Sequence, residues 1–149
     1  MERIVLEKLF RSAIVIASEE QAEEAFRVFF RGFESDRRFV PYLVELIEAD
    51  WHKRHEDIAS CLQKSKDNRA TPALLRTAIR KFDYLDYDNS YALARKCTWA
   101  LADIGTQESR AALEVISRND DETIAGYAIR RLERWQLEHD RKGGNEDLG

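Results

Sequence analysis

A nine-residue pattern occurs three times in this chain at nearly regular spacing. Segments 35–43, 66–74 and 105–113 align with one another: each has Asp or Thr at its second position and Leu at its ninth. The first two segments lie 31 residues apart, and the third follows 39 residues after the second. A period in the thirties is typical of repeat architectures, in which each repeat is one supersecondary unit. We therefore expect a chain of stacked repeats.

Apolar residues recur at helical spacing throughout the chain, which predicts an all-α fold. Only 6 Gly and 2 Pro occur in 149 residues, and a strand-rich fold would need more of both in its turns. One helix pair cannot cover its own apolar stripe, so pairs are expected to stack. The eight predicted helices pair into four units and lie roughly at 1–16, 18–32, 36–47, 51–62, 67–79, 90–104, 106–116 and 120–135.

The helix ends carry recognisable signals. Ser18 and Gln21 have the spacing of a capping box, in which both side chains satisfy free backbone donors. Gly32 and Gly105 are placed to end helices in the left-handed conformation, and Thr106 can cap the helix that follows. These signals support the predicted boundaries.

Segment 94–105, followed by the capped helix start at 109–113, resembles a short bacterial HEAT repeat of the phycobilisome lyase-like type. The resemblance covers roughly residues 35–135 and implies a right-handed α-solenoid of about four HEAT-like helix pairs. On this basis residues 1–138 form a single domain, whose first 34 residues are an N-terminal capping pair, and residues 139–149 form a flexible polar tail. The repeat is nearly silent on function, because HEAT repeats serve scaffolds, adaptors, inhibitors and a few enzymes.

The eight extra residues before the third copy of the pattern fall in region 82–91, where aromatic or aliphatic residues alternate with aspartates. Insertions in repeat proteins map to loops on one face, often the binding face. We therefore predict partner contacts from Tyr84, Asp86, Tyr87 and Asp88, whose carboxylates would attract a basic surface. The alternative is an extended helix end plus turn, with Phe82 and Leu85 packed down. A calcium loop is disfavoured, since the glycine and glutamate of an EF-hand loop are missing.

Aligned repeats place further candidates on the outward face of the second helices. Trp99 and Arg130 fall in one row and Lys96 in the next, on the face that would be concave in a solenoid. Trp99 and Arg130 could form a cation–π patch for a partner, or routine cover between stacked helices. Because acidic residues interrupt the rows, phosphate binding is disfavoured.

No catalytic or metal motif is apparent. His52, His55 and Glu56 could share a helix face, but they lack a third and fourth ligand, so a solvated helix start anchored by Trp51 is expected instead. Cys61 and Cys97 fall on apolar faces and are predicted to be buried. We expect neither metal nor cofactor.

The sequence thus favours a non-enzymatic protein-binding module in the cytoplasm. Net charge is −4, no signal-peptide pattern opens the chain, and no segment is long enough to cross a bilayer. A compact acidic HEAT protein could be a dedicated inhibitor, such as an immunity protein that neutralises a bacterial toxin, whose partner would present a basic surface. The alternative is a nucleic-acid-acting enzyme of the helical-repeat DNA glycosylase type.

Overall fold

The computed structural model describes residues 2–88 and 91–141, with the backbone alone described at 86–88. These residues form nine α-helices and three short 3₁₀ segments, and no strand occurs among them. The α-helices are α1 (Glu2–Ile16), α2 (Glu19–Phe29), α3 (Val40–Ile47), α4 (His55–Ser65), α5 (Thr71–Ala78), α6 (Tyr91–Ile104), α7 (Gln107–Ile116), α8 (Glu122–Glu133) and α9 (Trp135–Arg141). The 3₁₀ segments are η1 (Arg37–Phe39), η2 (Asn68–Ala70) and η3 (Asp83–Asp88). The predicted all-α fold is confirmed.

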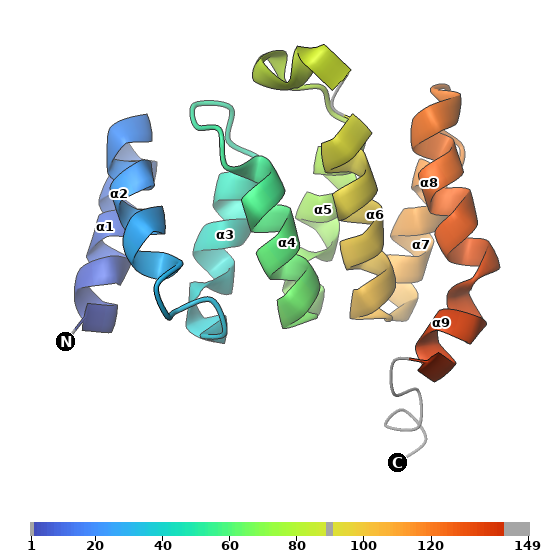
Figure 1. Ribbon diagram of the computed structural model, residues 1–149, viewed down its shortest axis with the longest axis horizontal. Coiled ribbons are helices and arrows are strands. Elements are labelled where there is room, and N and C mark those ends of the chain that lie inside the picture. Colours follow the sequence, from blue (N-terminus) through green and yellow to red (C-terminus); the bar gives the residue numbers. More distant parts are fainter. Residues whose placement is uncertain (1, 89–90, 142–149) are drawn as a thin grey trace.

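The helices form two layers that run along the long axis of the molecule (Figure 1). Helices α4, α6 and α8 lie in the front layer of this view, and α3, α5 and α7 lie behind them. Within the layers α6 packs against both α4 and α8, while α5 packs against both α3 and α7. Helices α1 and α2 pack on each other at the N-terminal end, and α9 follows α8 at the other end.

All three copies of the sequence pattern start a helix at a capping side chain, and the first two share the same turn. Asp36 and Asp67 each accept a hydrogen bond from the backbone two residues later, and a 3₁₀ turn then leads into a helix with proline in its first turn. Thr106 caps α7 directly, and the Ser109 side chain completes the reciprocal capping box. Proline is tolerated in a first turn because its missing N–H would have no intrahelical partner there.

Hydrogen bonds and ion pairs connect residues separated by about one repeat. Arg54 pairs with Glu23, 31 residues earlier, at 2.6 Å, and the Tyr91 hydroxyl donates to Asp121, 30 residues later, at 2.8 Å. Across the longer repeat, Gln63 donates to Asp103, 40 residues away, at 2.8 Å. Equivalent positions of successive helix pairs therefore lie next to each other.

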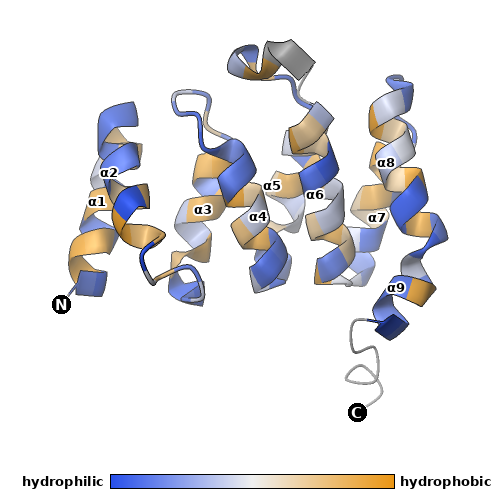
Figure 2. Cartoon of the chain, in the orientation of Figure 1, coloured by the Kyte–Doolittle hydropathy of each residue, from blue (hydrophilic) through white to orange (hydrophobic). Residues whose placement is uncertain are grey.

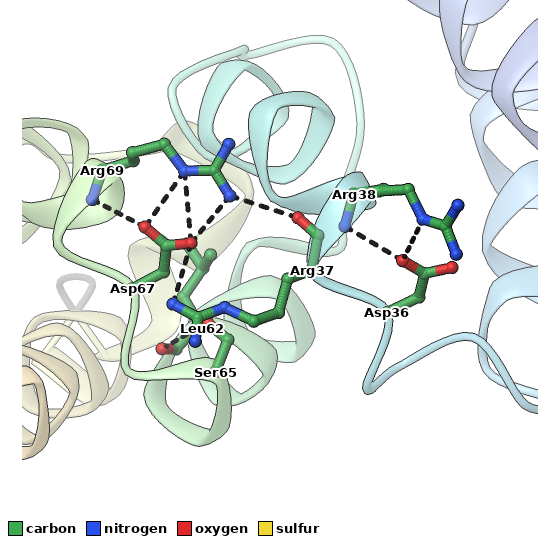
Figure 3. A network of polar contacts seen from close by, with 7 residues as sticks. All are labelled: Asp36, Arg37, Arg38, Leu62, Ser65, Asp67 and Arg69. Carbon is green, nitrogen blue, oxygen red and sulfur yellow. Dashed lines mark hydrogen bonds and ion pairs between the residues drawn. The ribbon is translucent and has the colours of Figure 1, made fainter.

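One of these connections is a charged network at the starts of the repeats (Figure 3). The Asp67 carboxylate accepts from the guanidinium of Arg69 at 2.7 Å and pairs with that of Arg37 at 3.1 Å. Arg69 also donates to the main-chain carbonyl of Arg37, 32 residues earlier, at 3.2 Å. The hydrogen bond from Arg69 is the main cause that holds the pKa of Asp67 well below its usual value. Asp67 thus caps its own helix and joins it to the preceding repeat.

The core is aromatic at the N-terminal end and mostly aliphatic beyond it. Phe10 lies at the centre of a cluster in which its ring contacts those of Phe26, Phe29 and Phe39 at centroid distances of 5.5–5.9 Å. Apolar and polar residues alternate along the helices (Figure 2), as expected where each helix turns one face to the core. Cys97, Leu101 and Ile104 of α6 are buried as predicted.

One predicted helix end is wrong and one predicted capping box is only half formed. Helix α2 ends at Phe29, three residues before Gly32, and the helix closes through Phe30 in a right-handed conformation. The left-handed glycine is found at Gly105, where φ is +72°, while Ala17 takes this conformation at the end of α1. The capping box at Ser18 is half formed: Ser18 accepts from the Gln21 backbone, but the Gln21 side chain accepts from Ser12 instead, at 2.6 Å.

The fourth and eighth helices also differ from prediction. Helix α4 begins at His55 rather than Trp51, because residues 51–53 bend to bury His52. Helix α8 is capped by Asp121 and ends at Glu133, after which α9 begins. The expected domain limit at residue 138 falls inside α9. The remaining residues of the expected tail, 142–149, lie outside the described part of the chain.

Candidate functional site

The candidate site is a groove between α6 and α8, of about 530 Å³. We call it the α6/α8 groove. It is lined by three residues of α6 and six of α8, namely Arg95, Thr98, Trp99, Glu122, Thr123, Gly126, Tyr127, Arg130 and Arg131. The two aromatic rings are half-buried, while Arg95 and Arg130 are exposed. Three cations therefore line the groove against one carboxylate.

One wall of the groove is a stacked and paired arginine. The Arg131 guanidinium lies over the Trp99 ring at 3.6 Å from its centroid, and it donates to the Glu138 carboxylate of α9 at 2.9 Å. Burial lowers the pKa of Arg131, while the charge of Glu138 opposes this shift. Arg134 donates to the same carboxylate at 3.1 Å. Arg131 is thus fixed from two sides.

The structure brings together two of the predicted contact residues and changes the pairing between them. Trp99 and Arg130 both line the α6/α8 groove, but the cation over Trp99 is Arg131 and not Arg130. Repeat alignment identified Arg130 by its spacing from Trp99, whereas Glu138, which holds Arg131, comes from α9, a helix that the sequence did not predict. Lys96 is half-buried on α6 and does not line the groove.

Tyr84 belongs to a different surface. It lies in η3, which is seen above the ends of α5 and α6 in Figure 1, and its hydroxyl bonds to His55 at 2.6 Å. Phe82 and Leu85 are buried, as the alternative interpretation of this insertion expected. The side chains of Asp86, Tyr87 and Asp88 lie outside the described residues. Tyr84 instead borders a second hollow of about 300 Å³, which it shares with His52, Arg80 and Phe82.

His52 and His55 are a buried, stacked pair and not part of a solvated helix start. Their ring centroids are 4.2 Å apart with an angle of 11° between the planes, and the Phe82 ring lies 4.2 Å from His55. All four ring nitrogens have hydrogen-bonding partners, which are the carbonyls of Leu46 and Ala49, the N–H of Arg54 and the Tyr84 hydroxyl.

These partners determine the protonation of both rings. A carbonyl can only accept, so Nε2 carries the proton in each ring and Nδ1 accepts. Burial is the first cause that lowers the pKa of both histidines, and that of His55 falls to about 4. The pair is therefore neutral at physiological pH and has no free nitrogen for a metal.

Other reactive groups are buried as predicted. Burial raises the pKa of the Cys61 thiol to about 11 and that of Cys97 further, so both thiols stay protonated. Among the described side chains, those of residues 2–85 and 91–141, no group of three or more His, Cys, Asp or Glu is placed to hold a metal ion. Over the same residues, no helix has both the length and the apolar character needed to span a membrane.

Comparisons of the chain with protein-family models, curated proteins and solved structures find no match. The site must therefore be interpreted from its own geometry. Of the groove residues, only Trp99 and Arg130 were predicted as contacts, and Gly126 and Arg131 are among those that sequence reasoning missed. The signal that could have found Gly126 is its position in the middle of a predicted helix, where a glycine destabilises the helix.

Proposed function

We propose that the protein is a non-enzymatic protein-binding module, built as a right-handed solenoid of about four HEAT-like helix pairs. The hydrogen bonds and ion pairs between residues about one repeat apart support the solenoid, because such contacts recur wherever equivalent positions stack. Solenoids use the face formed by one layer of helices for binding. Helices α4, α6 and α8 would provide that face.

The α6/α8 groove is the observation that carries the proposal. It presents Trp99 and Tyr127 beside exposed arginines, and aromatic residues and arginine are the types most enriched at interface hot spots. The fixed Arg131–Trp99 stack would add little entropy cost on binding, because both side chains are already held. A partner would therefore meet a preformed surface.

A dedicated inhibitor, such as an immunity protein that neutralises a bacterial toxin, is the specific role that we propose. Such a protein needs one tight interface and no catalytic group of its own. The aspartates of segment 83–88 would supply a second contact area for a basic region of the partner. Weaker binding at high salt and on Asp86→Asn substitution would support this second area.

The test is capture of the partner from cells of the source organism, with a variant that fills the groove. Gly126 is exposed, and a Cβ atom added there would meet no neighbouring side chain or element within 4 Å. Gly126→Trp should therefore fill the groove without disturbing the fold, and Gly126→Ala is its matched control. We expect one stoichiometric partner with the unchanged protein and with Gly126→Ala, and its loss with Gly126→Trp.

Either of two results would count against the proposal. Equal capture by all three proteins would exclude the groove as the binding surface. Recovery of many weak partners and no stoichiometric one would exclude the inhibitor role in favour of a general adaptor.

The second candidate function is a nucleic-acid-acting enzyme of the helical-repeat DNA glycosylase type, because three arginines line the groove. This function predicts that the protein is retained on heparin or DNA at low salt, and that charge reversal at Arg95, Lys96 and Arg130 abolishes this retention. Failure to be retained would exclude it.

A further inference from the structure

Arg95 and Arg130 are the cations in the α6/α8 groove that are left without an acidic partner. Both are exposed, and neither forms an ion pair within the described part of the chain, whereas Arg131 is paired with Glu138 at 2.9 Å. Arg134, the residue that follows α8, also differs from them, because it shares the Glu138 carboxylate at 3.1 Å. The groove thus holds two guanidinium groups that can accept an anion from outside.

Gly126 is a second and independent feature of the same groove. It lies in the interior of α8, where glycine costs about 1 kcal/mol relative to alanine. No packing reason explains it, because the space around its missing side chain is open. Glycine without a packing role is suited to the close approach of another main chain to the helix backbone.

We propose that the α6/α8 groove binds an acidic segment of a protein partner, with carboxylates on Arg95 and Arg130 and the partner's main chain passing over Gly126. This inference rests on the proposed protein-binding function and names the chemistry of the segment that enters the groove. A guanidinium group matches a carboxylate with two parallel hydrogen bonds, which gives both strength and orientation. The Trp99 ring would cover the apolar part of the segment.

Charge and size favour a short peptide over a nucleic acid. The chain has a net charge of −4, and Glu122 lines the groove itself. A long polyanion would meet this negative field over its whole length, whereas a segment with two or three carboxylates would meet only the local cations. A groove of about 530 Å³ accommodates a few residues of a peptide and not a duplex.

The test uses a fluorescein-labelled hexaglutamate peptide and fluorescence anisotropy on the full chain. We expect binding that weakens with salt. The double variant Arg95→Glu/Arg130→Glu should weaken it by about tenfold or more, since exposed cations dominate the contact. Gly126→Trp should weaken it as well, and Gly126→Ala should leave it unchanged. Circular dichroism checks that each variant keeps its helical content.

The matched charge control is Arg27→Glu/Arg31→Glu, which makes the same change of charge near the C-terminal end of α2, at the other end of the row of helices (Figure 1). This control should bind hexaglutamate nearly as well as the unchanged protein. Equal weakening by both double variants would show that net charge alone drives binding, and would overturn the site.

Two further outcomes separate this inference from the proposed function. If the partner is captured in a Gly126-dependent way but hexaglutamate does not bind, the acidic segment is wrong and the binding module stands. If single-stranded oligothymidylate binds in the groove more tightly than hexaglutamate, the acidic-segment inference and the protein-binding function are both overturned, and a nucleic acid is the ligand.

Discussion

The buried histidine pair makes the stability of this protein sensitive to mild acid. Burial, followed by electrostatic repulsion from His52 in its protonated form, lowers the pKa of His55 to about 4 from its usual value near 6.5. In the unfolded chain the ring titrates near that usual value, so between about pH 6.5 and pH 4 the unfolded state binds a proton that the folded state does not. The free energy of unfolding must therefore fall as the pH falls through this range.

The size of the effect follows from the shift. Each unit of pKa difference is worth about 1.4 kcal/mol, so the shift of His55 corresponds to about 3 kcal/mol over the whole range and about 2 kcal/mol by pH 5. His52 acts in the same direction, because its pKa is also lowered by burial. Carboxylates with lowered pKa, such as Asp67 and Glu23, lose their stabilising contribution only below about pH 4.5. The interval from about pH 6.5 to pH 5 thus isolates the histidines.

The assay is urea denaturation, followed by circular dichroism at several pH values within this interval. The free energy of unfolding of the unchanged protein should fall by about 2 kcal/mol or more across this interval, and that of His55→Gln should fall much less. The variant is also less stable than the unchanged protein at neutral pH, because a buried hydrogen-bonded ring is gone. His139→Gln is the matched control and should keep most of the slope, since both buried rings remain. A flat profile in the unchanged protein, or an undiminished slope in His55→Gln, would refute the reasoning.

Three further predictions concern stability and can be measured by thermal or urea denaturation. Gly126→Ala should raise the free energy of unfolding by about 1 kcal/mol and the melting temperature by about 2–4 °C. The reason is that this glycine lies mid-helix on the exposed face and has open space around it. A loss of stability would show that the fold itself needs the glycine. Glu138→Ala should lower the free energy of unfolding by about 3 kcal/mol, because it leaves the buried Arg131 without its carboxylate. The control is Glu114→Ala, which breaks the exposed ion pair with Arg110 and should lower the free energy of unfolding by less than about 1 kcal/mol. Ser18→Ala should lower the free energy of unfolding by about 1 kcal/mol and Gln21→Ala by clearly less, since only the serine side chain caps a backbone donor of α2. Equal losses of stability would mean that the full capping box forms in solution.

Most of the helical plan could be predicted from the sequence, because the signals for it are local. The pattern at 35–43, 66–74 and 105–113 combines a capping residue with apolar spacing, and each copy starts a helix where predicted. The buried face of α6 followed from its 3.6-residue period. Errors at Gly32 and Gln21 were also local: both residues can end or cap a helix, and only the surrounding chain decides whether they do.

The candidate site depends on contacts between residues distant in sequence. Trp99 and Arg130 could be placed on one face by repeat spacing, but the cation over Trp99 is Arg131, because Glu138 of the unpredicted helix α9 draws the guanidinium to that position. His52 and His55 are near neighbours in sequence, and spacing alone suggested an exposed helix start. Their burial is decided by Phe26, Phe82 and Tyr84, which enclose them from other parts of the chain. Local sequence thus determined where the helices form, while tertiary packing determined which side chains are buried, paired or left free, since burial and pairing depend on residues that no local pattern brings together.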